Sequence, residues 1–208
     1  MDYDIEKLNF FQEELVKQLS SKDSFDKEKV KTVGGCDVSF KENRATCAIV
    51  VLDYNSLEVV EKKASEIDIS MPYIPGYLSF REGPAILRTY RMLENKPDIL
   101  LFGRNGILHP KKMGIASHMG ILLNIVTIGV AKKLLLGDVK EDRVFVDGEE
   151  RADIMHTKEG CNPIYVSPGH KISLATSVEI VRHCMKGHKL PEPIRLAHNL
   201  ASESKRSG

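Results

Sequence analysis

Apolar side chains recur every three or four positions at the start of the chain, which predicts an amphipathic helix. Its apolar face comprises Ile5, Leu8, Phe11, Leu15 and Leu19. Three segments rich in strand-forming residues follow at 32–40, 45–54 and 58–69, separated by the short polar connections KENR and NS. Connections of this length join adjacent antiparallel strands. The pattern therefore predicts a helix followed by a three-stranded antiparallel unit.

Helical and strand patterns alternate in the rest of the chain. Helical spacing covers residues 84–94, 112–123 and 173–185, and short strands are expected at 98–102, 126–130, 143–146 and 164–167. The run DILLF at 98–102 is typical of a strand covered on both faces. We predict one α/β domain over 1–200, with a mixed central sheet flanked by helices, and a frayed tail at 201–208. The pattern alone does not separate the mixed three-layer folds from one another.

The charge balance limits how the chain can meet a polyanion. Its 208 residues include 30 Lys and Arg against 29 Asp and Glu, a formal net charge of +1. This balance excludes an extreme basic footprint, so contact with nucleic acid requires a local patch. Lys111, Lys112, Lys132 and Lys133 are the candidates for such a patch.

Cysteine spacing and hydropathy indicate the compartment. The four cysteines are irregularly spaced and form no C-x-x-C pair, which favours reduced thiols in a cytoplasmic protein. The N-terminus lacks the basic region of a signal peptide. The most apolar stretch, at 121–131, is about half the roughly 20 residues that a membrane span needs. We therefore expect a soluble, cytoplasmic protein without membrane contact.

Two acidic residues stand in unusual places. Asp37 interrupts an apolar strand, where a buried carboxylate is costly unless a cation neutralises it. Alternatively, Asp37 lies at a turn or at a sheet edge, where an aspartate needs no functional role. Glu82 stands at the predicted entry to a helix beside Pro84. There it would either bind a cation or interact favourably with the positive end of the helix dipole.

Three loops carry further candidate chemistry. Residues 71–83, MPYIPGYLSFREG, form a proline-stiffened loop whose Tyr73 suits wedging or stacking against a base. Residues 102–110, FGRNGILHP, follow the buried strand, and ligands gather at the carboxyl ends of strands in such sheets. A third loop places His170 after a Pro-Gly turn, although an isolated loop histidine is more often incidental.

These segments resemble the endonuclease V family. The resemblance rests on GGCDVSF, PYIPGYLSFREGPAI, NGILHPKKMGIASHMGI, IGVAKKLLLG, SPGHKISLATSVEIV and LPEPIRLAH, in family order and spacing. It implies an RNase H-like fold and a DNA repair endonuclease that acts at deaminated bases, chiefly deoxyinosine. The implied reaction is Mg²⁺-dependent hydrolysis of the second phosphodiester on the 3′ side of the lesion, with Mn²⁺ able to substitute. The implied partner is DNA containing deaminated bases, or inosine-containing RNA, and we expect a monomer.

The resemblance also implies roles for single residues. Asp37 and Glu82 match metal ligands, and Tyr73 matches the wedge that fills the gap left by an extruded base. His109 and Lys132 match polar residues near the scissile phosphate, and His170 matches a histidine at the edge of the site. We expect two loops to supply the base contacts, through Tyr73, Ile74, Pro75, Gly76, Asn105, Gly106, Ile107 and Leu108.

One ligand of the family pattern is missing. The third motif reads Asp-Gly-x-Gly-Ile-x-His-Pro, and counting back from His109 puts its metal-binding aspartate at Gly103. Asp98 cannot replace it, because the strand between them spans about 16 Å at roughly 3.3 Å per residue. Asn105 offers a neutral oxygen, which is a weaker ligand for a hard cation.

Three interpretations of this difference stay open. The first is an endonuclease impaired by an accidental or introduced loss at Gly103, and it predicts poor cleavage of inosine-containing DNA. The second is a homologue that has lost catalysis and only binds deaminated nucleic acid. The third, a generic RNase H-type nuclease, is disfavoured by PYIPG, because an enzyme that extrudes no base has no use for a rigid aromatic wedge.

Overall fold

The predicted three-stranded unit is present in the computed structural model, which describes residues 4–203. Its strands are β1 (Thr32–Lys41), β2 (Arg44–Asp53) and β3 (Val59–Asp68), and both neighbouring pairs are antiparallel. Lys41 lies opposite Arg44 across a two-residue turn, where Glu42 takes a φ of 51°. Primed hairpin turns need such positive φ values, so the short connection fixes the antiparallel pairing.

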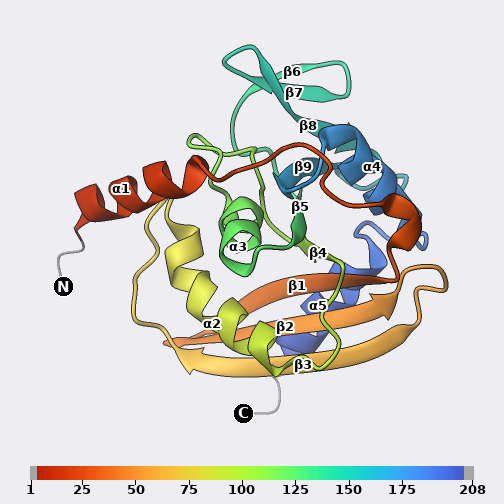
Figure 1. Ribbon diagram of the computed structural model, residues 1–208, viewed down its shortest axis with the longest axis horizontal. Coiled ribbons are helices and arrows are strands. Elements are labelled where there is room, and N and C mark those ends of the chain that lie inside the picture. Colours follow the sequence, from red (N-terminus) through yellow and green to blue (C-terminus); the bar gives the residue numbers. More distant parts are fainter. Residues whose placement is uncertain (1–3, 204–208) are drawn as a thin grey trace.

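The rest of the sheet extends from β1 (Figure 1). The strand order is β3-β2-β1-β4-β5-β9-β8-β7-β6. β4 (Ile99–Phe102) is parallel to β1, and β5 (Val126–Ala131) is parallel to β4. The remaining strands are antiparallel to their neighbours: β9 (Ile164–His170), β8 (Glu149–Met155), β7 (Arg143–Val146) and β6 (Asp138–Lys140). The sheet is therefore mixed, which confirms the predicted architecture, although the charged strands β6 and β8 carry no apolar pattern from which to predict them.

Helices cover both faces of the sheet. Leu100 and Phe102 of β4 pack with α2 (Leu78–Met92) and α3 (Ile115–Leu123), while Ile99 and Leu101 pack with α4 (Leu174–His183) and α5 (Glu192–Glu203). Successive strand residues point to opposite faces, so an apolar strand such as β4 requires cover on both. Figure 1 shows α2 in front of the first strands and α5 behind them.

Two helix starts differ from the prediction, and one helix was not predicted. α2 begins at Leu78, so Pro84 lies inside the helix and Glu82 is in its second turn, not at its entry. The expected loop at 71–83 therefore ends at Tyr77. α3 begins at Ile115 because Gly114 is its N-cap. The sequence pattern does not predict α5, whose residues 201–203 fall in the expected tail; the rest of that tail lies outside the described residues.

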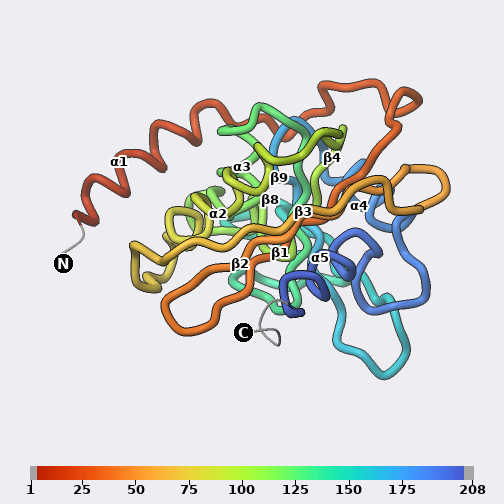
Figure 2. Tube along the Cα trace, turned by 90° about the horizontal axis from the view of Figure 1, so that it is seen from below, coloured from red at the N-terminus to blue at the C-terminus, as the bar shows by residue number. Residues whose placement is uncertain are grey.

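The first helix lies at the edge of the fold. α1 (Ile5–Val16) extends away from the sheet in Figure 2. Ile5 and Phe11 are exposed, so the predicted apolar face is not fully buried. Gln12, which is buried, donates a hydrogen bond from Nε2 to the Gly76 carbonyl at 2.8 Å and ties α1 to the loop before α2. None of the helices described over residues 4–203 has the length and hydropathy to cross a membrane.

Candidate active site and nucleic-acid pocket

The end of β4 lies directly beside Asp37 of β1. Cys36 pairs with Phe102 across the two parallel strands, and the Gly103 N–H donates to the Cys36 carbonyl at 3.2 Å. A Cβ atom added to Gly103 would lie 3.1 Å from Oδ1 of Asp37. Position 103 is therefore the point from which an additional side chain would meet the Asp37 carboxylate.

Glu82 reaches the same place from α2. Its side chain is buried, with 1% of the residue exposed, against 7% for Asp37. Burial raises the pKa of Glu82 to about 7, with Arg104 opposing this shift and Asp37 adding to it. Folding thus brings two acids together in a region of low solvent access, where each ionised carboxylate requires a compensating positive charge.

Arg104 supplies that charge from the loop after β4. Its Nη2 lies 3.3 Å from Oε1 of Glu82, and its Nη1 lies 3.7 Å from Oδ1 of Asp37. Nη1 also donates to the Gly103 carbonyl at 3.1 Å. Burial lowers the pKa of Arg104, but Glu82 and Asp37 outweigh this effect and raise it above its ordinary value. The guanidinium is therefore a permanent cation between the two acids.

His198 contacts the other oxygen of Asp37. Its Nδ1 lies 2.6 Å from Oδ2, and it comes from α5 on the far side of β1. Neither His198 nor Arg104 is among the site residues predicted from the sequence. The only sequence signal for Arg104 is a basic residue directly after the position of the missing aspartate, and His198 ends the family-like segment LPEPIRLAH.

The residues at this point do not fit the expected divalent metal site. Mg²⁺ requires several oxygen ligands in a near-octahedral arrangement, and Gly103 contributes no side chain. Across residues 4–203, no cluster of three or more His, Cys, Asp or Glu side chains is arranged to hold a metal ion. The space enclosed by Asp37, Glu82, Gly103 and Arg104 leaves no room for a water molecule.

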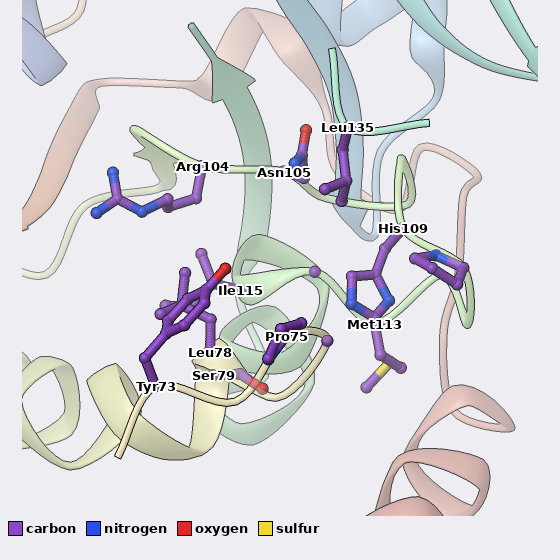
Figure 3. Close-up of a pocket in the computed structure, with 13 residues that line it drawn as sticks. Tyr73, Pro75, Leu78, Ser79, Arg104, Asn105, His109, Met113, Ile115 and Leu135 are labelled. Carbon is purple, nitrogen blue, oxygen red and sulfur yellow. The ribbon is translucent and has the colours of Figure 1, made fainter. Parts of the chain in front are cut away.

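A pocket of about 350 Å³ adjoins the acid pair (Figure 3). Tyr73, which is 65% exposed, lies on one side of it, and His109 lies on the opposite side. The other lining residues are Pro75, Gly76, Ser79, Arg104, Asn105, Pro110, Met113, Gly114 and Leu135. Arg104 belongs both to this pocket and to the acid pair, so a ligand in the pocket would lie next to the two carboxylates.

Two polar atoms of the pocket residues lack a partner. Oδ1 of Asn105 and Oγ of Ser79 are buried, and neither has a hydrogen-bond partner within the described residues. A buried polar atom without a partner is costly, so these atoms are candidates for hydrogen bonds to a ligand.

The pocket wall includes only part of the set predicted to contact the base. Tyr73, Pro75, Gly76 and Asn105 line it, whereas Ile74, Gly106, Ile107 and Leu108 do not. Gly106 anchors the loop instead, because its N–H donates to Oγ of Ser167 at 2.9 Å. Leu108 is buried in the core beneath β7 and β8. The base contacts assigned to these four residues stay predictions.

The remaining predicted residues, His109, Lys132 and His170, come from different parts of the fold. His109 lines the pocket. Burial lowers its pKa to about 4, although a hydrogen bond with the Gly76 backbone acts to raise that pKa. Lys132 is exposed directly after the last residue of β5. His170 pairs with Thr127 near the start of β5, at the other end of that strand, and accepts a hydrogen bond from the Ser20 N–H at 3.3 Å. Its assignment to the site also stays a prediction.

Two of the four candidate lysines are paired with acids. Lys111 forms a salt bridge with Glu13 of α1, and Lys112 forms one with Glu149 of β8. These pairs reduce the positive charge offered to a polyanion. The exposed lysines Lys132 and Lys133 are the stronger candidates for phosphate contacts.

Comparison with known proteins places the chain in a family. The endonuclease V family profile matches residues 13–199. The chain is 43% identical over 195 residues to endonuclease V of Dictyoglomus thermophilum, covering 90% of this chain and 85% of that protein. The structure of Ciona intestinalis endonuclease V in complex with a 23mer DNA containing an inosine followed by a ribo-adenosine is similar over 100% of this chain and 99% of that one, with a TM-score of 0.90 and 31% identity. Human ENDOV gives a TM-score of 0.90 at 29% identity, over 98% of each chain. The chain therefore belongs to the endonuclease V family.

Proposed function

We propose that this chain binds nucleic acid containing a deaminated base, chiefly inosine, and that it hydrolyses the backbone poorly. The observation that carries the proposal is the pocket beside the Asp37–Glu82 pair, with the exposed Tyr73 at its mouth. An extruded base needs a pocket to enter and a side chain to fill the gap that it leaves in the stack. The inosine-containing DNA in the Ciona intestinalis complex supports the same class of ligand.

The polar groups of the pocket suit hypoxanthine. Its N1 carries a hydrogen and donates, whereas N1 of adenine accepts. Asn105 lines the pocket, and its side-chain oxygen, which has no partner within the described residues, would accept such a hydrogen bond once the amide turns toward the base. A site built to pair with one N–H discriminates strongly against a base that lacks it, because the buried acceptor is then left unsatisfied.

The hydrolytic step is expected to be weak. The family reaction implies cleavage at the second phosphodiester 3′ to the lesion, with Mg²⁺ or Mn²⁺ as cofactor. With Gly103 at the position of the third-motif aspartate and Arg104 between the remaining acids, the side chains offer too few oxygen ligands for that ion. Among the interpretations left open by the sequence, this shortage of ligands favours an endonuclease V that still recognises the deaminated base but hydrolyses the backbone poorly.

Paired binding and nicking assays test the proposal. Fluorescence anisotropy with DNA duplexes that differ only in one inosine or adenine measures recognition, and an inosine-containing RNA strand measures the alternative substrate. The same DNA, incubated with Mg²⁺ or Mn²⁺, measures nicking. We expect preferential binding of the inosine strand with little nicking. Equal affinity for the inosine and adenine duplexes would overturn the recognition proposal, and rapid nicking would overturn the proposed impairment.

A further inference from the structure

We infer that Arg104 is a built-in cation that takes the place of a divalent metal between Asp37 and Glu82 and leaves the protein able to bind nucleic acid without metal. The claim about the acid pair rests on geometry alone. The claim about nucleic acid rests on the proposed function.

The guanidinium has the position and charge that this role requires. It lies 3.3 Å from a Glu82 oxygen and 3.7 Å from an Asp37 oxygen, so it interacts with both acids at once. The second oxygen of Asp37 is held by His198 at 2.6 Å. A metal ion would have to displace Arg104 and then bind beside its positive charge. The existing contacts therefore act against metal binding.

Two adjacent positions depart from the family motif together. Where the motif reads Asp-Gly, this chain has Gly103 and Arg104. The first difference removes a carboxylate whose Cβ would lie 3.1 Å from Oδ1 of Asp37, and the second brings a cation to the same oxygen. A single accidental loss at position 103 would leave glycine at 104. The paired difference instead indicates that the guanidinium of Arg104 has replaced the charge of the metal ion.

Arg104 also retains the means to contact a phosphate. Guanidinium carries five N–H donors, and within the described residues its hydrogen bonds go to the Gly103 carbonyl and to Glu82. Its side chain is 35% exposed and lines the pocket. Guanidinium groups match phosphate geometry through paired donors, so Arg104 is able to hold the acids with one edge and the nucleic-acid backbone with another.

Manganese titration of the free protein tests the first claim. Calorimetry with MnCl₂ is carried out on the natural chain, on Arg104→Gly, and on the double variant G103D/R104G. We expect the double variant to bind Mn²⁺ at least about tenfold more tightly than the natural chain. Saturable Mn²⁺ binding to the natural chain, as tight as to the double variant, would overturn the claim. Because no nucleic acid is present, this result stands even if the proposed recognition of inosine fails.

Binding of an inosine-containing duplex tests the second claim. We expect the natural chain to bind equally in EDTA and in Mg²⁺. Arg104→Gln should weaken binding and reduce the salt dependence by the slope of about one phosphate contact, while Arg104→Lys keeps the charge and retains most of that slope. A strict Mg²⁺ requirement in the natural chain, or an unchanged slope in Arg104→Gln, would overturn the claim. Thermal unfolding identifies any variant that does not fold, and Arg104→Lys then carries the comparison.

Discussion

The Gly103 N–H donates to the Cys36 carbonyl at 3.2 Å, and this bond sets the end of β4 against Asp37. The next residue, Arg104, consequently reaches both Asp37 and Glu82. This member of the endonuclease V family thus has a glycine followed by a fixed cation where the family motif has an aspartate followed by a glycine.

Restoring the family motif should increase nicking of inosine-containing DNA. Gly103→Asp alone returns a carboxylate but leaves Arg104 beside it, so we expect the larger gain in G103D/R104G, about two orders of magnitude over the natural chain. Gel-based nicking with Mg²⁺ measures the rates. The control is Gly148→Asp, which adds the same charge at an open turn with no neighbouring atom within 4 Å. Equal rates in the natural chain, Gly103→Asp and the double variant would refute the assignment of position 103.

Removing the aromatic ring of Tyr73 should weaken inosine binding without unfolding the protein. Base–aromatic stacking contributes about 1–3 kcal/mol, so Tyr73→Ala should lose at least about fivefold in affinity for the inosine duplex. Tyr73 is 65% exposed, so its loss should change the free energy of unfolding little. Anisotropy measures binding, and Tyr73→Phe, which keeps the ring, should bind as the natural chain does. A Tyr73→Ala variant with unchanged affinity would count against the wedge.

Acid should destabilise the fold in part through His118. Burial lowers the pKa of His118 to about 4, and its Nδ1 has no partner within the described residues. The unfolded chain, with an ordinary histidine pKa near 6.5, then binds more protons than the folded chain between about pH 6.5 and pH 4. The stability contributed by neutral His118 is complete above that range and is lost as the pH falls through it.

Urea unfolding of the natural chain and His118→Phe at pH 7 and pH 4.5 measures this contribution. The variant keeps an aromatic ring against Phe80, which lies 5.0 Å from the His118 ring centroid. We expect the natural chain to lose about 2 kcal/mol more than the variant on acidification. Identical losses would show that His118 does not titrate in this way.

Adding one methyl group at Gly106 should distort the pocket loop. A Cβ there would lie 2.0 Å from the Pro168 carbonyl oxygen, which is backbone and cannot rotate away. Overpacking of this kind costs about 3 kcal/mol, so Gly106→Ala should lower the urea midpoint strongly. Gly160→Ala is the matched control: its φ of +72° adds only about 1 kcal/mol of backbone strain, and nothing lies within 4 Å. Similar midpoints for the two variants would contradict the predicted clash.

Local patterns predicted much of this protein. The alternation and short turns of the first three strands give β1, β2 and β3 with boundaries within a few residues, and the apolar run at β4 predicts cover on both faces. α4 begins one residue inside the predicted helix at 173–185, with Ser173 as its N-cap. Such features depend on residues within a few positions of one another. The sequence motifs in addition indicated the family and the two candidate acids, Asp37 and Glu82.

The tertiary structure decided the remainder, because it depends on residues far apart in the chain. Pro84 suggests a helix start, but packing of α2 extends the helix to Leu78 and buries Glu82 in its second turn. Arg104 becomes a partner of Asp37 and Glu82 only when β1, β4 and α2 meet. The sequence by itself determined which charged groups exist and which family they resemble. Folding decided which of them neutralise one another, because charge compensation depends on distance and burial, and neither can be read from the order of the residues.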